Sequence, residues 1–283
     1  MGAAEDVTVI PAPYLPFTDP HKGRPPGLFP LPAGDWTEAD GAFAPQMALR
    51  DRLIAEYPGL VTLALPEASD ALAETVSALS DHLSRCPGYI LRGDSLVRPD
   101  GVCLRLAPSA GTLGRLTQED WLILQHPADG GEAVLTAGAL CFPAHWNLPD
   151  KLGKPLSRVH DPVPGYADTL AARVNRVFSA LHPDRPLQRL NWSLASTPHL
   201  HCPRPQGRRT GEAPHYLRVE RQTLRRLPRT GAIVFGVKTY LTPLSSLSPP
   251  ARQALLDRIA GLSPNMADYK GGTDYLGAAG VDT

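Results

Sequence analysis

The chain has 283 residues, of which 42% are hydrophobic and 20% are charged, as in an ordinary soluble globular protein. Lys plus Arg and Asp plus Glu both number 28, and this balance argues against a dedicated nucleic-acid binder, which carries a strong basic excess. No apolar run approaches the roughly 18 residues of a membrane span, and the first residues lack the basic and apolar parts of a signal peptide. We therefore expect a cytoplasmic protein with no nucleic-acid or membrane partner.

Proline is unusually frequent at the start of the chain. The sequence holds 31 prolines, and eight of them fall within residues 1–40. Because proline fixes φ and has no backbone N–H, this segment cannot form a regular helix or a central strand. We expect residues 1–40 to form an extended arm packed on a single domain made of residues 41–283.

Helical periodicity follows the arm. The clearest case comes after Pro66, where apolar residues recur at spacings of four, three and four and therefore share one face: Leu72, Val76, Leu79 and Leu83. Pro87 and Gly88 end this helix. Further helices are predicted at 43–57, 166–181 and 251–262.

Strand patterns lie between and after these helices. The segments are apolar or alternating and are bounded by Gly, Pro or Asp: 102–106, 121–125, 133–142, 189–195, 217–225 and 233–241. The loop 227–231 contains Pro228 and Gly231, which suit a hairpin between the last two strands. Helices mixed with mostly antiparallel strands predict an α+β fold.

Several common site motifs are absent from the sequence. It has no GxGxxG after a strand, no GxxxxGK[ST], no GxSxG and no HExxH. The four cysteines are 17, 38 and 61 positions apart and form no CxxC, so we expect free buried thiols and no iron–sulfur cluster in this chain. Any reducing equivalents would have to come from a partner protein.

Two histidine-containing segments are candidate metal sites. His160 is followed by Pro162 and Pro164, which fix the backbone behind the imidazole, and a rigid backbone suits a metal ligand. The alternative is a capping or core histidine at a loop-to-helix junction. In His199-Leu200-His201-Cys202, strand-like alternation would place Cys202 opposite the two imidazoles, so a surface loop is the alternative there.

Strand 217–225 alternates in an unusual way. One face carries Arg218, Glu220 and Gln222, while Arg221 lies on the other face. Such a polar row must face solvent or a polar cavity, because unpaired buried charge is costly. Arginines grip carboxylates such as haem propionates, and a lone glutamate could hold a small ammonium ion or relay a proton.

Six segments, in order and spacing, resemble the haem subunit of haem-dependent oxidative N-demethylases of the dimethylamine monooxygenase type. They are QEDW at 118–121, CFPAHW at 141–146, KLGK at 151–154, VHDPVP at 159–164, RLNW at 189–192 and the strand 218–228. The opening Pro13–Phe17 and the late Tyr269-Lys270 are also similar, so the resemblance covers nearly the whole chain.

The resemblance implies a PAS-like antiparallel sheet with flanking helices that binds haem b and its iron. It also implies a monooxygenase that uses O2 to remove a methyl group from a small secondary amine such as dimethylamine, giving a primary amine and formaldehyde. The electrons would come from NADPH through a separate reductase that carries FMN and an iron–sulfur cluster, and tetrahydrofolate-linked capture of formaldehyde is associated with such complexes.

The same resemblance suggests residue roles. His160 would be the axial ligand of the iron, and Glu220, with Arg218 beside it, would act in catalysis by pairing with the substrate ammonium or managing protons. The residues expected to bind the propionates or pack on the macrocycle are Arg189, Arg221, Trp146 and Trp192.

Two alternatives remain open at this stage. One is a non-catalytic haem-binding PAS-like sensor or interaction module. The other is a mononuclear non-haem iron enzyme, although His160 and Asp161 are adjacent and do not form the HxD part of a 2-His-1-carboxylate set.

Overall fold

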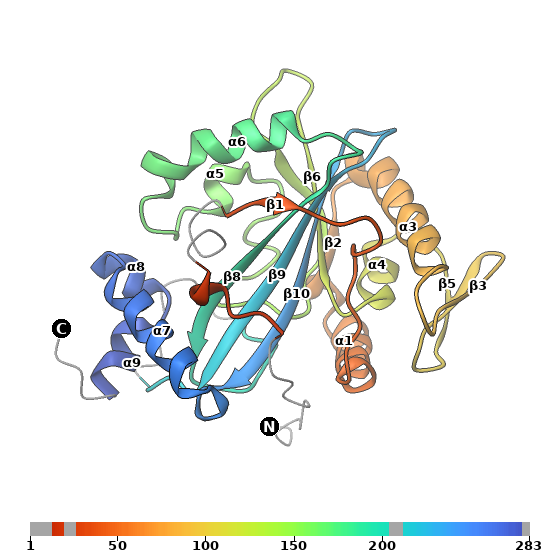
Figure 1. Ribbon diagram of the computed structural model, residues 1–283. Coiled ribbons are helices and arrows are strands. Elements are labelled where there is room, and N and C mark those ends of the chain that lie inside the picture. The colour runs from red at the N-terminus through yellow and green to blue at the C-terminus, as the bar shows by residue number, and fades with distance from the viewer. Residues whose placement is uncertain (1–12, 20–26, 204–211, 279–283) are drawn as a thin grey trace.

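The computed structural model describes residues 13–19, 27–203 and 212–278, and its framework is one antiparallel sheet (Figure 1). Its seven strands lie in the order β1-β8-β9-β10-β6-β7-β2. Their bounds are β1 (Phe29–Pro30), β2 (Thr62–Ala64), β6 (Asp120–Gln125), β7 (Val134–Ala139), β8 (Leu187–Ala195), β9 (Tyr216–Arg226) and β10 (Ile233–Pro243). With the helices around it, this sheet confirms the α+β prediction.

The long strands β8, β9 and β10 fix which side chains are neighbours. β9 and β10 form the predicted hairpin, paired from Arg226↔Ile233 to Tyr216↔Pro243. In the register of the three strands, Asn191, Glu220 and Thr239 lie side by side on one face. Because successive side chains point to opposite faces of a strand, Arg221 lies on the other face.

Nine α-helices surround this sheet in the part of the chain that the structure describes. They are α1 (Phe43–Glu56), α2 (Pro58–Val61), α3 (Ser69–Leu83), α4 (Ala110–Leu116), α5 (Leu156–Val159), α6 (Ala171–Ala180), α7 (Pro249–Ala260), α8 (Pro264–Tyr269) and α9 (Gly272–Ala278). In Figure 1, α7, α8 and α9 lie at the lower left, α5 and α6 at the upper left, and α1, α3 and α4 at the right.

The predicted helices are confirmed, with one difference. In α3 the predicted stripe is buried as expected: Leu72, Val76, Leu79 and Leu83. The helix predicted at 166–181 begins as a π-helical turn, Tyr166–Leu170, and only then continues as α6. A π-turn widens the backbone ring and is frequent near functional sites.

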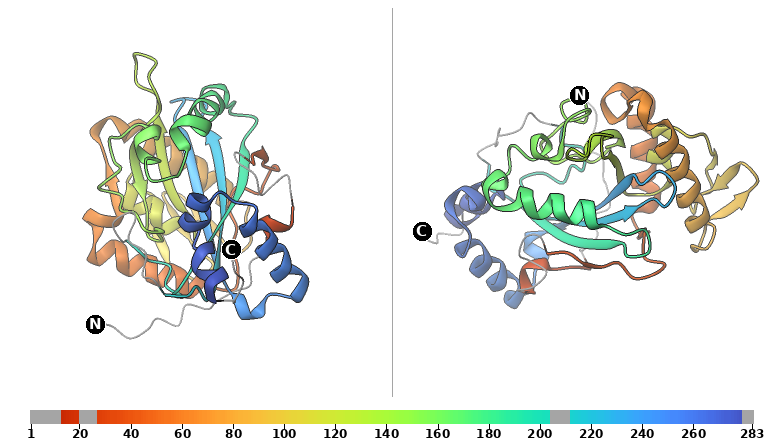
Figure 2. Two further views of the ribbon diagram at one scale, coloured as in Figure 1. Left: turned by 90° about the vertical axis from the view of Figure 1, so that its left-hand side faces the viewer. Right: turned by 90° about the horizontal axis from the view of Figure 1, so that it is seen from above.

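A second, small sheet was predicted only in part. The segment 102–106 contains β5 (Cys103–Arg105), but its partners β3 (Ile90–Arg92) and β4 (Ser95–Val97) are too short to show a clear alternation. This sheet projects from the molecule beyond α3 (Figure 2).

Apolar clusters cover both faces of the long strands. On the face of Arg221, Trp192 and Val219 pack against α7, α8 and α9. On the face of Glu220, Leu224 and Phe235 pack against Leu156 of α5 and Phe178 of α6. The two faces of one sheet therefore contact different sets of helices.

The N-terminal arm is described at residues 13–19 and 27–40, whereas Pro11, Pro20, Pro25 and Pro26 lie outside the described residues. Phe17 meets the Trp192 ring edge-on, with ring centroids 6.1 Å apart. The arm therefore packs on the sheet at this point. Its separation from a single domain of residues 41–283 stays a prediction.

All four cysteines are free, but the expectation that they are buried holds fully only for Cys141, because Cys103 is exposed. Over residues 13–19, 27–203 and 212–278, no helix combines the length and the hydropathy needed to cross a membrane.

Candidate functional site

A short extension of the sheet positions His160. Residues 153–156 run beside the start of β7, where the Gly153 N–H donates to the Leu135 carbonyl at 2.8 Å and the Leu156 N–H donates to the Ala133 carbonyl at 3.0 Å. The chain then forms α5, and His160 is the residue that ends it. The predicted loop-to-helix junction is therefore a rigid turn tied to the sheet.

The ring of His160 is held on two sides. Its Nδ1 lies 2.9 Å from the Leu156 carbonyl oxygen, and its plane stacks on Tyr166 with centroids 4.4 Å apart and 8° between the planes. A carbonyl only accepts, so Nδ1 carries the hydrogen and Nε2 keeps its lone pair. Among the described residues, Nε2 has no hydrogen-bond partner.

The His160 imidazole is neutral at physiological pH. Burial lowers its pKa most, the positive charges of Arg189 and Lys151 lower it further, and the hydrogen bond to Leu156 only partly opposes them. A neutral imidazole with one nitrogen hydrogen-bonded to a carbonyl and the other unprotonated is the form that ligates metals.

A group of polar side chains lies on the same face of β8 and β9. We call it the polar cluster, and it consists of Arg189, Asn191, Arg218, Glu220 and Gln222. At its centre, Glu220 accepts hydrogen bonds from Arg218 Nε at 3.1 Å, Gln222 Nε2 at 2.9 Å and Asn191 Nδ2 at 3.4 Å. Three donors thus converge on one carboxylate.

Glu220 is ionised in spite of its depth in the protein. Burial pushes its pKa upward, but the charge of Arg218 and the three hydrogen bonds outweigh burial, so the pKa of Glu220 lies below its ordinary value. Its side chain keeps 14% of its surface accessible. Arg218 is itself anchored, since its NH2 group donates to the Phe142 carbonyl at 2.7 Å and to Thr239 at 3.1 Å.

Arg189 has no such anchor. It makes no hydrogen bond or ion pair with any residue the structure describes, and its Nε is buried without a partner. The hydroxyl of Tyr166 is also buried and without a partner within the same ranges. Since a buried donor without an acceptor costs about 1–3 kcal/mol, this part of the site is suited to an incoming group with acceptor atoms.

Lys270, which is distant from the polar cluster in the sequence, also contacts it. It follows α8 at the edge of the sheet, where the Leu194 N–H donates to the Lys270 carbonyl at 2.8 Å. Its Nζ donates to Asn191 Oδ1 at 3.1 Å and to the Trp192 carbonyl at 2.6 Å. Burial, with Arg189 and Arg258 adding to it against the opposing charge of Glu220, lowers the pKa of Lys270 to about 7.

The structure brings together most of the predicted site residues. Arg189 links them, because its charge lowers the pKa of His160 and the charge of Glu220 acts on Arg189 in turn. Trp146 packs in the apolar cluster that contains Val159, next to His160 along the chain. Leu156, Val159 and Trp146 pack in the same apolar cluster as Leu224 and Phe235, which lie on the Glu220 face, so His160 and Trp146 lie toward the face that carries the polar cluster.

Two predicted site residues lie elsewhere. Arg221 points to the opposite face, where its Nε is 3.0 Å from Glu38 Oε1 and also donates to Gln188. Trp192 lies on that same face, against Phe17. The alternation along β8 and β9 separates both from the polar cluster, although the sequence had grouped them with it.

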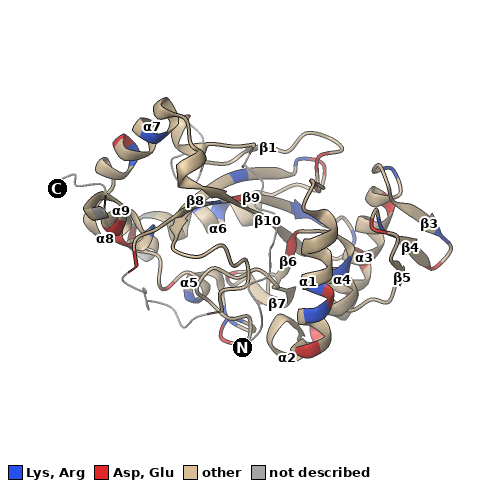
Figure 3. Ribbon diagram, turned by 90° about the horizontal axis from the view of Figure 1, so that it is seen from below, with Lys and Arg blue, Asp and Glu red and all other residues tan. Residues whose placement is uncertain are grey.

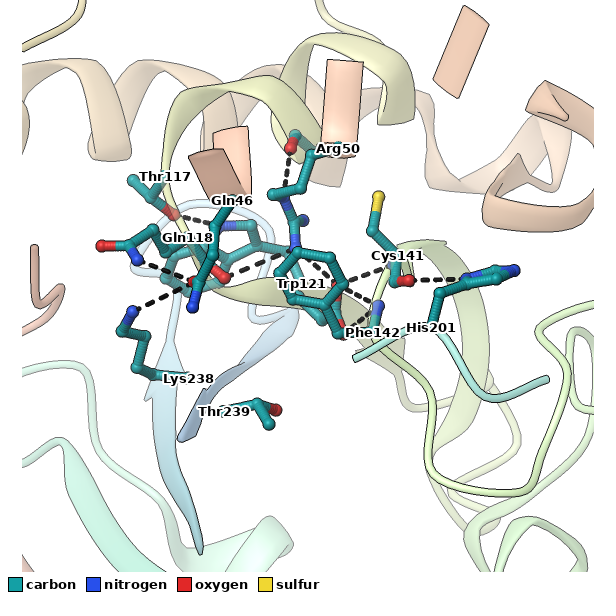
Figure 4. Close-up of polar contacts among 12 residues, drawn as sticks. Gln46, Arg50, Thr117, Gln118, Trp121, Cys141, Phe142, His201, Lys238 and Thr239 are labelled. Atoms are coloured by element: carbon teal, nitrogen blue, oxygen red, sulfur yellow. Dashed lines mark hydrogen bonds and ion pairs between the residues drawn. The ribbon is translucent and has the colours of Figure 1, made fainter. Parts of the chain in front are cut away.

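The segment His199–Cys202 has another role. The Nδ1 of His201 donates to the Cys141 carbonyl at 2.8 Å (Figure 4), and the thiol of Cys202 lies 3.2 Å from the His199 carbonyl. Within the described part of the chain, no three His, Cys, Asp or Glu side chains gather as a metal-binding group. The Pro- and Arg-rich residues 204–211 lie outside that part.

The charges of the site are unequal. Arg189 and Arg218 supply two positive charges, Lys270 adds a third below its pKa of about 7, and Glu220 supplies one negative charge. A ligand with two carboxylates would balance the difference, and arginine binds carboxylates in a fixed geometry.

A comparison with protein families gives a match over most of the chain. The family described as haem-dependent oxidative N-demethylase, alpha subunit-like, matches residues 27–279.

Proposed function

The chain belongs to the haem-dependent oxidative N-demethylase alpha subunit-like family, and we propose that it binds haem b through His160 and removes a methyl group from a small secondary amine. The family confirms the resemblance seen in the sequence and supports haem as the cofactor. The observation that carries the proposal is the neutral His160, with its free Nε2, on the same face as the ionised Glu220.

The residues present fit a haem. A porphyrin supplies four nitrogen ligands, so one imidazole from the protein is enough to hold the iron. The buried, unpartnered Nε of Arg189 and the positive excess around it suit a haem propionate. In this assignment Tyr166 keeps the His160 ring in place by stacking, and the Leu156 carbonyl fixes its tautomer.

Glu220 would select the substrate. A small secondary amine is a cation near neutral pH, and the accessible part of the ionised Glu220 offers it a counter-charge. Arg218, Asn191 and Gln222 hold the carboxylate in one orientation. Bound haem would supply the iron that uses O2 to oxidise the methyl C–H bond, and the overall reaction converts amine, O2, two electrons and two protons into demethylated amine, formaldehyde and water.

The electrons would come from another polypeptide. The sequence has no nucleotide-binding motif and no CxxC, and the family description refers to an alpha subunit, which implies further subunits. We propose a reductase that carries FMN and an iron–sulfur cluster and oxidises NADPH, together with tetrahydrofolate-linked capture of the formaldehyde in the same complex.

The iron ligand is tested by absorption spectroscopy of the haemin-loaded protein before and after dithionite. His160→Ala should abolish or strongly shift the Soret band. His182→Ala removes an exposed histidine that pairs with the exposed Asp184, and it should leave the spectrum unchanged. A normal spectrum in His160→Ala would remove this residue from the ligand role.

The reaction is tested by measuring formaldehyde from dimethylamine under O2 with a compatible reductase. Glu220→Gln should keep its haem but bind the amine about ten- to a hundredfold more weakly, because a charge-assisted contact is lost. Full amine affinity in this variant would refute the role of Glu220. Haem binding without formaldehyde in the wild-type protein would instead support a non-catalytic haem-binding sensor or interaction module.

A further inference from the structure

Lys270 is an interior lysine among other cations. Its Nζ lies against β8, and the charged groups that face it are Arg189 on β8, Glu220 on β9 and Arg258 on α7. The Trp192 ring, whose centroid is 4.9 Å from Nζ, and the Trp192 carbonyl are favourable neighbours, but burying an ammonium beside guanidinium groups is costly. Its position therefore calls for a further explanation.

The contacts of Lys270 fix the orientation of one amide. An ammonium only donates hydrogen bonds, so the Asn191 atom 3.1 Å from Nζ must be the carbonyl oxygen. A carboxylate only accepts, so the Asn191 atom 3.4 Å from Glu220 Oε2 must be the NH2 group. The contacts of Asn191 with Lys270 and with Glu220 therefore require the same orientation of its amide.

We infer that Lys270 is a positioning residue for Glu220: it holds the Asn191 amide with its NH2 group toward the carboxylate and so keeps Glu220 ionised and oriented. Asn191 is free to turn when Lys270 no longer holds its oxygen, and a turned amide would present that oxygen to the carboxylate. The role in amine binding rests on the proposed function, whereas the effect on Glu220 itself does not.

Two simpler roles for Lys270 make different predictions. If Lys270 only secured α8 to β8, through its backbone bond to Leu194 and the contacts of Nζ with the carbonyl and ring of Trp192, Glu220 would not respond to a change of its side chain. If it acted only through its charge, its effect on Glu220 would persist after Asn191 was removed. A double-mutant cycle separates these cases.

The first experiment follows the carboxyl carbon of Glu220 by carbon-13 NMR in the full-length protein without added haem, with Glu220→Gln to assign the signal. Lys270→Met should raise the titration midpoint by about one pH unit, and Lys270→Arg, which also only donates, should stay near wild type. In the Asn191→Ala background, Lys270→Met should have almost no further effect. An unchanged midpoint in Lys270→Met, or an undiminished shift in the Asn191→Ala background, would overturn the inference.

The second experiment titrates the haem-loaded protein with dimethylamine and follows the Soret band. Glu220 stays ionised near neutral pH in both proteins, so Lys270→Met should weaken binding about tenfold because the carboxylate loses the fixed orientation that pre-organises it for the amine. Lys270→Arg should restore binding. Amine binding in Lys270→Met equal to wild type would overturn the positioning role. A wild-type protein that does not respond to any small amine would refute the proposed substrate, and the NMR cycle would still decide the effect of Lys270 on Glu220.

Discussion

Glu220 and Arg221 are neighbours on β9, yet their side chains point to opposite faces of the sheet, and the charged groups on those two faces differ. Arg221 points to the face where an ion pair with Glu38 and a bond to Gln188 satisfy it. Glu220 points to the face where Arg189 has no partner among the described residues and Lys270 adds a further cation. Figure 3 shows basic and acidic residues on the central strands as well as on the outer helices.

On the face of Arg221, acids from the N-terminal segment supply the counter-charges. Lys238 lies 2.8 Å from Asp40, and Glu38 accepts hydrogen bonds from Tyr14 and Tyr240 as well as from Arg221. Gln118, the first residue of the QEDW segment, joins this network by donating to Asp40. Its side chain also donates to Gln46 (Figure 4). The chain completes these pairs by itself.

A buried charge does not by itself identify a ligand-binding site in this protein. On the face of Arg221, the fully buried Arg221 and Lys238 pair with Glu38 and Asp40, whereas on the face of Glu220 the half-buried Arg189 has an enclosed Nε without a partner and no ion pair among the described residues. Removing one partner of a buried pair leaves an uncompensated charge and destabilises the fold, whereas a buried charge that has no partner in the chain can be compensated by a ligand. Four substitutions test this contrast.

The largest effect is expected for Lys238→Met. Lys238 is fully buried and Asp40 is 17% exposed, so the variant leaves a largely buried carboxylate without its cation. The free energy of unfolding, measured with urea, should fall by about 3–5 kcal/mol. Adding Asp40→Asn should recover part of the loss, and a single variant as stable as wild type would show that the pair is unimportant.

Asp40→Asn alone should have a smaller and pH-dependent effect. Burial raises the pKa of Asp40, but Lys238 and the bonds from Gln118 and the Ala42 N–H outweigh it, so its pKa is lowered in the folded state. The stabilisation from the ionised form is complete above the unfolded pKa of about 3.9 and is lost as pH falls through the folded value. The deficit of the variant, about 2 kcal/mol at pH 7, should therefore shrink below about pH 4, and a constant deficit would contradict this.

Arg189→Met, on the other face, should change the free energy of unfolding by less than about 1 kcal/mol or even raise it, because no ion pair with a described residue is lost and a half-buried cation with an unpartnered Nε is removed. Its affinity for haemin should nevertheless fall by about tenfold, as measured by Soret titration. Arg185→Met, which changes an exposed arginine, is the matched control. A loss of several kcal/mol with normal haemin affinity would make Arg189 a structural residue.

The smallest effect is expected for Arg105→Ser in the projecting sheet. Arg105 and Asp94 are 3.3 Å apart, but their side chains are 84% and 70% exposed. Exposed pairs contribute little, so urea unfolding should change by no more than about 0.5 kcal/mol. A larger loss would mean that charge pairing stabilises this protein regardless of burial, which would break the contrast between the two faces.

Much of the fold was predictable because its signals are local. The period of four, three and four in α3, the alternation along β8 and β9 and the Pro-Gly hairpin loop each reside in neighbouring residues. Shorter elements such as β3, β4 and α5 were missed, since three or four residues are too few to show a period.

The candidate site was predictable only in part. His160 and Glu220 stood out because prolines and an alternating polar row mark them within a few positions. Lys270 appeared only within the Tyr269-Lys270 segment of the family resemblance, with no role assigned. It lies 79 positions from Asn191, and no local sequence pattern predicts a contact over that distance.

By itself the sequence determined the α+β class, the order of the main elements, the family and the two rows of side chains on β9. Only the tertiary structure decided that acids of the N-terminal arm pair with the cations on the Arg221 face, while Arg189 on the Glu220 face has no ion pair among the described residues. It also decided that Arg221 and Trp192 lie apart from the polar cluster and that Lys270 contacts it. Alternation is set by the backbone of a single strand, but the partner of a buried charge comes from whichever distant segment packs against that face.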